Sequence, residues 1–450
     1  MGRITQGLGL AICLSLGTTS AMADDLVSIL DLAMRNDPTL RQAEAQYKSR
    51  QTILDQGRAA LLPSLALQGS TARQTSGLAG DMSFRPGQNT HGYRLNLTQA
   101  VFNLAAWYAY EGAKLQDRAG AINYAAQEQN LIIRVATAYF NVLRAQDDLA
   151  TRSQEEAAAQ RQFEQTQQRE EVGLVAITEV YESQAAYDLA RNNTILAEDT
   201  LATRYEALEA ITGQPHPNID VLREDFPIVS AEGTAESWTQ QALDSNLALI
   251  AARYNVEAQQ ENLKARKADH LPTISLTGLF SHNVTAGGQS AEGGLRFAGA
   301  IDGTSLALNI NIPLYTGGGT SARRRAAEYD LVATQEALSL TRRQTTQDVR
   351  NAYRRVNTDS LVIAQRQQAI TSARSALEAV EVGYEVGTRN IVDVLQARQQ
   401  LFVALRNYSD ARYNYVVDTL LLKQTTGLLT PQDIIDLNEW LETESANAAP

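Results

Sequence analysis

The strongest candidate for ion chemistry in this sequence is one carboxylate, Asp393, within the stretch YEVGTRNIVDVLQ at residues 384–396. Asn390 precedes it by three positions, and Gln396 and Gln400 follow at steps of three and four, so the four side chains share one helix face. If several copies of the chain surrounded one axis, their Asp393 carboxylates would lie close together. Their mutual repulsion would raise the cost of ionising all of them, and their negative charge would attract cations. Alternatively, Asp393 caps its own helix, with Asn390 as the other half of a capping box. The two interpretations are compatible, and both stay open.

No catalytic or metal-binding motif accompanies this carboxylate. The histidines are His91, His216, His270 and His282. They lack metal-ligand spacing, so we expect them at surface or capping positions. The stretch TGGGTSARRR at residues 316–325 lacks the Gly-Lys-Ser/Thr ending of a phosphate loop, and a strand-to-helix junction explains it better. The sequence therefore predicts no enzyme, no cofactor and no metal site.

The first residues are typical of a targeting segment. Arg3 precedes a short apolar run, and Ala21 and Ala23 form a small-x-small cleavage site, so we expect residues 1–23 to be a signal peptide. The sole cysteine, Cys13, lies inside it, which leaves the mature chain without a thiol. Without Arg3 the chain carries 38 basic (39 − 1) against 51 acidic residues, and a net charge of −13 disfavours nucleic acid as a partner. No later apolar window of about 20 residues predicts a transmembrane helix.

The sequence contains an internal duplication. LPSLALQG begins at Leu62 and LPTISLTG at Leu271, an offset of 209 (271 − 62). Further on, Gly173 and Gly387 occupy matching positions at an offset of 214 (387 − 173). Matches along the whole chain with two small shifts indicate that each half folds as one copy of a common unit.

Each half shows the same predicted order of helices and strands. We expect a first repeat at residues 24–228, a second at 229–437, and a disordered C-terminal tail at 438–450. Two strands per repeat alternate apolar and polar residues over about ten positions, which is the length and pattern of membrane-spanning strands. They are expected at about residues 62–75, 91–102, 271–283 and 303–315. The alternative is a four-stranded soluble sheet with one buried face.

Very long helices follow the strands. Residues 103–168 and 319–382 read as helix without proline, and at 1.5 Å per residue each would be about 100 Å long. Gln, Ala, Arg and Glu recur on most faces, which favours a tube of helices over a solid bundle. Glycines in the left-handed conformation would end them at hairpin tips, residues 172–178 and 386–392, and we expect Thr178 to cap the helix after the first tip.

Several fragments resemble the TolC family of outer-membrane efflux channels. They are GLVAITEV, VGTRNIVDVL, LLPSLAL, HLPTISLTG, ATAYFNVLRA and ARYNYVVD, and the match covers essentially the whole mature chain. The resemblance implies an α+β membrane protein, a homotrimer in which four strands per protomer close a 12-stranded β-barrel. This barrel would lie in the outer membrane of a Gram-negative bacterium and continue into a long periplasmic α-helical barrel.

The resemblance also assigns site residues. Asp393 takes the place of the aspartate ring at the periplasmic mouth, and Gln396 stands where the best-known member has a second aspartate. The residues matching the links that hold this mouth shut are Arg389, Tyr384, Thr178, Glu179, Gln162 and Glu381. The tip residues expected to dock partners are Gly173, Leu174, Gly387 and Thr388. Glu179 replaces a shorter aspartate, and its expected partner is Arg389.

The function implied is a passive exit duct of tripartite efflux pumps or type I secretion systems. A periplasmic adaptor protein and an inner-membrane transporter, driven by protons or ATP, would open it. The alternative is a periplasmic coiled-coil adaptor or structural protein without a pore. Such a protein would give no ionic current when added to a planar bilayer. Near the strands, Trp107, Tyr108 and Tyr110 form either an interfacial aromatic belt or ordinary packing at the strand-helix junction.

Overall fold

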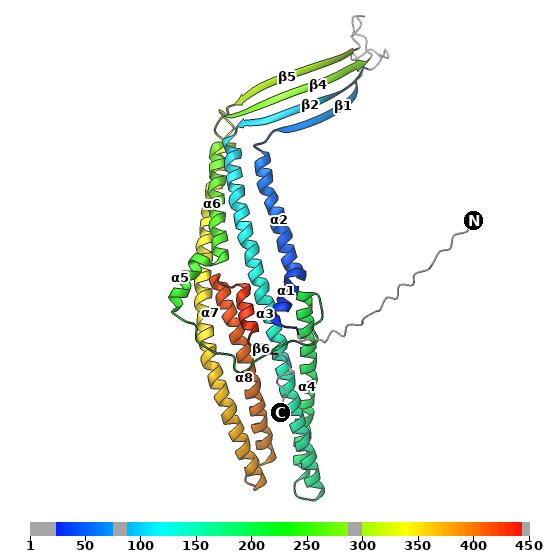
Figure 1. The fold of residues 1–450 in the computed structure, drawn as a ribbon, viewed down its shortest axis with the longest axis vertical. Coiled ribbons are helices and arrows are strands. Elements are labelled where there is room, and N and C mark those ends of the chain that lie inside the picture. The colour runs from blue at the N-terminus through cyan, green and yellow to red at the C-terminus, as the bar shows by residue number, and fades with distance from the viewer. Residues whose placement is uncertain (1–23, 75–87, 287–298, 443–450) are drawn as a thin grey trace, which may run out of the picture.

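The computed structural model describes residues 24–74, 88–286 and 299–442. The molecule is elongated, with a four-stranded sheet at one end and long helices running away from it (Figure 1). The expected signal peptide, residues 1–23, lies outside the described residues, as do residues 443–450 of the expected tail.

The two halves of the chain fold into the same series of helices. The first half contains α1 (Leu26–Asn36), α2 (Pro38–Ala59), α3 (Leu104–Glu171) and α4 (Ile177–Thr212). The second half contains α5 (Ala235–Ser245), α6 (Leu247–Ala268), α7 (Gly319–Glu385) and α8 (Ile391–Thr426), and α9 (Pro431–Asn438) follows. With 68 and 67 residues, α3 and α7 are each about 100 Å long. The predicted duplication is confirmed.

Equivalent residues begin and end the equivalent helices. Asp37 and Asn246, 209 positions apart (246 − 37), cap α2 and α6 by accepting a backbone N–H from the third helical residue. At the other end, Gly213 and Gly427 follow α4 and α8 with φ of 77° and 78°, a conformation that favours glycine. Local capping therefore sets the same helix boundaries in both repeats.

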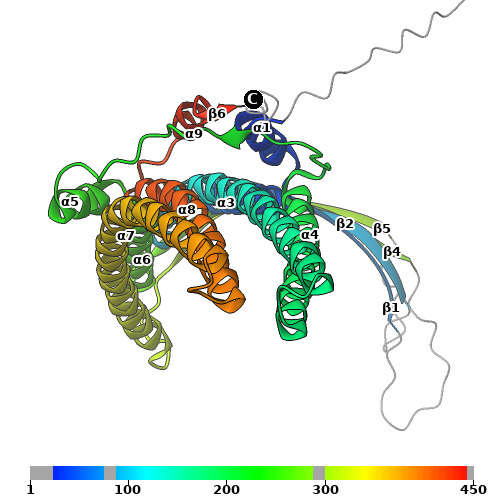
Figure 2. The ribbon, with the colours of Figure 1, turned by 90° about the horizontal axis from the view of Figure 1, so that it is seen from below.

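The long helices form one curved row in the order α7, α8, α3, α4 (Figure 2). On its convex side lie α1, α9 and the short strand β6 (Leu441–Glu442), which pairs with β3 (Val221–Leu222). Here the main hydrophobic core forms, around side chains such as Tyr139, Phe140 and Leu208 that are completely buried. The core therefore holds the helix row from one side at mid-length.

The expectation of disorder beyond Leu437 is wrong for residues 438–442. The Asn438 side chain accepts the backbone N–H of Leu26 at 3.0 Å and donates to Asp25 at 3.0 Å, which ties α9 to the first turn of α1. The early N–H groups of a helix need such acceptors. His216 is likewise not on the surface: it is buried, with Nδ1 2.7 Å from Asp24 Oδ2.

The sheet joins the two repeats. Its strands are β1 (Ser64–Gln74), β2 (Gln88–Phe102), β4 (Thr273–Ala286) and β5 (Gly299–Asn311), in the order β1-β2-β4-β5 with every neighbouring pair antiparallel. The range expected for the last strand, 303–315, is displaced by four residues at both ends. Pro313 has no N–H to extend the ladder, so Ile312 and Leu314 lie beyond the strand.

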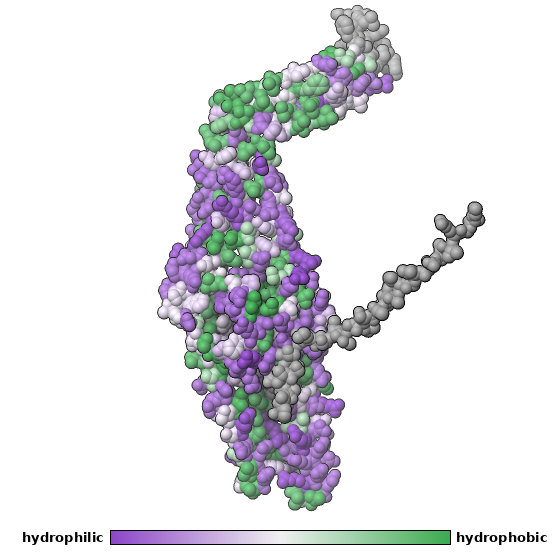
Figure 3. Space-filling model, in the orientation of Figure 1, coloured by the Kyte–Doolittle hydropathy of each residue, from purple (hydrophilic) through white to green (hydrophobic). Residues whose placement is uncertain are grey.

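One face of the sheet carries exposed apolar side chains. Leu65 and Leu67 of β1 are 66% and 70% exposed, and Leu306 of β5 is 73% exposed. Figure 3 shows the hydrophobic colouring gathered over the sheet and the adjoining helix ends. None of the helices in the described ranges is long and apolar enough to cross a membrane. The exposed apolar face of the sheet therefore indicates a surface that contacts another apolar surface rather than water.

Candidate functional site at the hairpin tips

Both hairpin tips are five-residue turns built on the same glycine geometry. After α3, Gly173 has φ 75°, and the N–H groups of Gly173 and Leu174 donate to the carbonyls of Glu170 and Arg169, each at 2.8 Å. After α7, Gly387 has φ 77° with the equivalent hydrogen bonds. An added Cβ would meet nothing within 4 Å at either glycine, so backbone conformation alone favours glycine there.

The tips expose apolar side chains at the end of the molecule farthest from the sheet. Leu174 is 73% exposed, and its neighbour Val172 is 70% exposed. Val386, at the second tip, is 67% exposed, and Thr388 is also exposed. The hydrophobic colouring of these ends is visible in Figure 3. A turn that faces only water usually carries polar side chains. The exposed apolar side chains at both tips therefore indicate a surface that contacts another protein.

Asp393 caps the helix that begins at the second tip. Its N–H donates to Asn390 Oδ1 at 2.8 Å, and the Asn390 N–H donates to Asp393 Oδ2 at 3.3 Å. The predicted capping box is therefore confirmed. Arg389 Nη1 lies 3.9 Å from the same carboxylate oxygen. Gln396, one turn further, is exposed and lines a hollow of about 360 Å³ together with the half-exposed Leu189 of α4.

Tyr384 and Glu179 connect the two hairpins near the tips. The Tyr384 hydroxyl on α7 donates to Glu179 Oε2 on α4 at 3.0 Å. The guanidinium of Arg169 lies over the Tyr384 ring, 5.5 Å from its centroid. Burial, together with the hydrogen bond to Glu179, raises the pKa of Tyr384, so the phenol stays a donor at neutral pH.

Gln162 and Glu381 line one hollow of about 490 Å³ with Tyr384, but they do not bond to each other in the part of the chain that the structure describes. Gln162 instead donates to Thr166 Oγ1 at 3.3 Å. Glu381 accepts from Arg398 Nη2 at 2.6 Å. Arg398 is therefore a member of this site that the sequence interpretation missed.

One further expectation differs from the structure, and another stays a prediction. Thr178 does not cap α4: the N-cap is Ala176, which makes no side-chain cap hydrogen bond, and Thr178 is the second helical residue. The helix begins earlier because the tip turn places Ala176, with φ −81° and ψ 150°, in extended conformation. Within the described ranges of this single chain, the ion pair of Arg389 is with Asp393, and its expected pairing with Glu179 stays a prediction.

The described residues hold no group of His, Cys, Asp and Glu that could bind a metal ion. The TGGGTS stretch leads from β5 into α7, with Gly317 and Gly318 at positive φ, so the strand-to-helix interpretation holds. Trp107, half exposed beside the strand ends, contacts Tyr110 edge to face at 6.4 Å.

The sequence model of the family described as "Outer membrane efflux protein" matches residues 29–214 and again residues 238–428. The outer membrane protein TolC of Vibrio cholerae is 36% identical over 439 residues, which cover 97% of this chain and 98% of that protein. The Proteases secretion protein PrtF of Dickeya chrysanthemi is 26% identical over 447 residues, covering 96% and 95% of the two chains.

Among solved structures, the Campylobacter jejuni CmeC outer membrane channel matches with a TM-score of 0.76 and covers 98% of each chain. At 17% identity this likeness shows the fold alone, but it spans both the sheet and the helices. The two family matches coincide with the two structural repeats. The chain therefore belongs to the outer membrane efflux protein family, the TolC family, and is an outer-membrane channel rather than an enzyme.

Proposed function

We propose that three copies of this chain form one channel-tunnel. The supporting observation is that β1 and β5 are the outer strands of an open sheet whose apolar face is exposed. Unpaired strand edges cannot lie in lipid, because their N–H and C=O groups would have no partner there. Pairing β1 of each copy with β5 of the next closes a sheet of twelve strands and leaves no edge. The concave side of the helix row then lines the tunnel.

The narrow point of this tunnel lies at the second hairpin tip. Three copies of Asp393 around the axis would form a ring of carboxylates that attracts cations. In each copy the capping box holds this carboxylate in the first turn of α8, with Arg389 Nη1 3.9 Å from it. Gln396 supplies a second, uncharged ring, so the mouth carries half the acidic charge of a double aspartate ring.

Side-chain links around the tips keep the mouth closed. The link between Tyr384 and Glu179 lies within one chain. Arg389 is exposed beside the tip and would reach Thr178 and Glu179 of the neighbouring copy. Gln162 and Glu381 contribute to the hollow behind Tyr384. Opening requires partners that separate these links, because the sequence shows no nucleotide-binding motif through which the chain could energise transport.

The partners are a periplasmic adaptor protein and an inner-membrane transporter driven by protons or ATP. They dock at the tips, where Gly173, Leu174, Gly387 and Thr388 form the exposed end of the helices. Similarity to TolC favours drug efflux by a tripartite pump, and similarity to PrtF favours protein export by a type I secretion system. One duct serves both pathways, since a polar tunnel selects weakly and the transporter chooses the cargo.

Two measurements test the proposal: the oligomeric state of the purified protein and its conductance in a planar bilayer. The detergent-purified chain is expected to run as a trimer and to give discrete single-channel currents in a planar bilayer. Calcium or another multivalent cation added at the periplasmic side should reduce the current, and Asp393→Asn should weaken this block. Protein that is monodisperse as single copies, or a bilayer that stays silent, would contradict the proposal and favour a periplasmic adaptor.

A further inference from the structure

The two helical hairpins of each chain meet along one line of contacts. Between the core and the tips, α3 and α8 lie side by side, with α4 and α7 at the two ends of the row (Figure 2). We call these contacts the hairpin seam. Its residues are Arg144, Asp147, Asp148, Glu155 and Ala158 on α3, and Arg398, Arg406, Ser409, Asp410, Tyr413 and Asn414 on α8. Any displacement of hairpin α7–α8 away from hairpin α3–α4 must separate these side chains.

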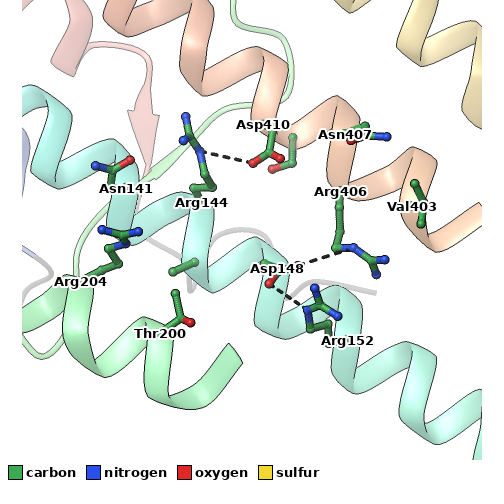
Figure 4. Close-up of a pocket in the computed structure, with 12 residues that line it drawn as sticks. Asn141, Arg144, Asp148, Arg152, Thr200, Arg204, Val403, Arg406, Asn407 and Asp410 are labelled. Carbon is green, nitrogen blue, oxygen red and sulfur yellow. Dashed lines mark hydrogen bonds and ion pairs between the residues drawn. The ribbon is translucent and has the colours of Figure 1, made fainter. Parts of the chain in front are cut away.

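Arg406 connects α8 to two carboxylates of α3. Its Nη1 lies 2.9 Å from Glu155 Oε2, and its Nε lies 3.7 Å from Asp148 Oδ1. Figure 4 shows the contact with Asp148 reaching from α8 across to α3. Only 17% of the Arg406 side chain and 15% of the Glu155 side chain are exposed. Glu155 has no other basic partner among residues 24–74, 88–286 and 299–442.

Arg398 holds three helices together from a position nearer the tips. It belongs to α8, its Nη2 donates to Glu381 Oε1 on α7 at 2.6 Å, and its Nη1 donates to the Ala158 carbonyl on α3 at 3.3 Å. Its side chain is 18% exposed. The hydrogen bond to Ala158 crosses the seam. The hydrogen bond to Glu381 orients the guanidinium so that Nη1 points at the Ala158 carbonyl.

Towards the core the seam continues through hydrogen bonds and one more ion pair. The hydroxyls of Ser409 and Tyr413 donate to Asp147 Oδ2. Arg144 on α3 donates to Asn414 Oδ1 on α8 at 2.6 Å, and its Nε lies 3.3 Å from Asp410 Oδ1 (Figure 4). These contacts adjoin the core, which does not separate without unfolding. Arg406 and Arg398 are therefore the seam contacts that lie where the hairpins are free to part.

We propose that Arg398 and Arg406 form a seam latch that holds hairpin α7–α8 against hairpin α3–α4 and limits the opening of the tunnel. The inference rests on the proposed gated channel, and it adds control points about two turns (Arg398) and about four turns (Arg406) along α8 from the second tip. A small movement of α8 away from α3 would part Glu155 from its guanidinium before the gap is wide enough to admit water, because only 15% of the Glu155 side chain is exposed while the hairpins are together. Removing one member of a shielded ion pair is strongly unfavourable, so the latch resists small separations and yields only to a large one.

Single-channel recording of Arg406→Gln tests the latch. We expect the ratio of open to closed states to rise about tenfold, an effect between that of losing an exposed ion pair and that of losing a fully buried one. The matched control is Arg355→Gln, which removes the same charge and a 3.8 Å ion pair with Asp418 that lies within hairpin α7–α8 and does not cross the seam. The charge-exchanged double variant, Arg406→Glu with Glu155→Arg, should return towards the wild-type ratio.

Each outcome decides the inference. An Arg406→Gln channel that gates like the wild type overturns it, and so does an equal effect of Arg355→Gln, because that would mean general loosening. If Arg406→Gln does not assemble, Glu155→Gln repeats the test while leaving the contact between Arg406 and Asp148. A wild-type chain that forms no channel would instead contradict the proposed function.

A second measurement keeps the latch testable without any current. Spin labels at Val172→Cys and Val386→Cys report the distance between the two tips in spin-diluted, detergent-solubilised protein, because both positions are exposed. Arg406→Gln should lengthen and broaden this distance, and Arg355→Gln should not. Unchanged distances in both variants would overturn the latch even if conductance could not be measured.

Discussion

Replacing Tyr384 by phenylalanine isolates one hydrogen bond of the candidate gate. The hydroxyl donates to Glu179 Oε2 at 3.0 Å, between α7 and α4. Phenylalanine keeps the ring, so the contact with Arg169, 5.5 Å from the ring centroid, and the packing of α7 survive. Only this one hydrogen bond between the two hairpins is lost, and Glu179 gains access to water as the tip loosens.

The expected magnitude follows from the chemistry of that bond. A hydrogen bond to a charged group contributes about 1.5–3 kcal/mol when buried, and partial exposure of both side chains reduces this to about 1 kcal/mol. If the three equivalent hydrogen bonds of a trimer break together, the closed state is destabilised by about 3 kcal/mol relative to the open state. Since about 1.4 kcal/mol is a factor of ten, the closed-to-open ratio should fall by roughly a hundredfold.

Planar-bilayer recording of Tyr384→Phe measures this directly as a rise in mean single-channel conductance. Tyr181→Phe is the matched control, because Tyr181 lies on α4 near the same tip, is 63% exposed and makes no hydrogen bond within the described part of the chain. Wild-type conductance for Tyr384→Phe, or an equal rise for Tyr181→Phe, would refute the assignment of this hydrogen bond to the gate.

Three further substitutions test other parts of the structure. Gln396→Asp should lower the concentration of multivalent cation that halves the single-channel current, since it adds a second carboxylate ring; an unchanged blocking concentration would count against both pore positions. Gly427→Ala should lower the melting temperature more than Gly213→Ala, although φ is nearly the same at both, because its Cβ would lie 2.2 Å from the Ser245 carbonyl oxygen; equal losses would contradict this. Burial and the neighbouring Asp418 raise the pKa of Asp359 from 3.8 to about 6, so the folded state binds this proton more tightly than the unfolded state, and the associated stability is present below about pH 4 and lost as pH rises through 6. Asp359→Asn should therefore flatten the pH dependence of melting between 4 and 6, and a slope like that of the wild type would rule out this carboxyl as its source.

Much of the fold is predictable because it depends on local patterns. Two examples are the N-caps of α2 and α6, Asp37 and Asn246, and the glycine turns at Gly173 and Gly387. Each is specified by a few neighbouring residues and can be recognised in the sequence. Alternation likewise locates the strands to within a few positions. The interactions of residues 438–442 escaped prediction because they pair with segments more than 200 residues away, as in the bond between Asn438 and Leu26. No local pattern specifies such a contact.

The same distinction separates the predicted and missed parts of the candidate site. Asn390 and Asp393 form their capping box across three positions, so sequence alone identifies it. Arg398 was missed because its partners are set by how α8 packs on α7 and α3. A usable signal existed: Arg398 follows the buried Ile391 and Val394 at helical spacing, and a charge within an apolar stripe needs a partner.

Duplication followed by divergence explains why the two tips differ in chemistry while sharing a backbone. Glu179 and Asp393 are equivalent positions, 214 apart (393 − 179), and each is the third residue of its helix. In the second repeat Asn390 draws the carboxylate of Asp393 into a capping box, which fixes it at the end of α8. In the first repeat the N-cap is Ala176, whose side chain cannot accept the N–H of Glu179, so no capping box forms there. The Glu179 carboxylate, on a side chain one methylene longer than that of Asp393, accepts instead from Tyr384 of the other hairpin. The N-cap residue and the third helical residue therefore differ together between a carboxylate that stays with its own helix and one that joins two hairpins.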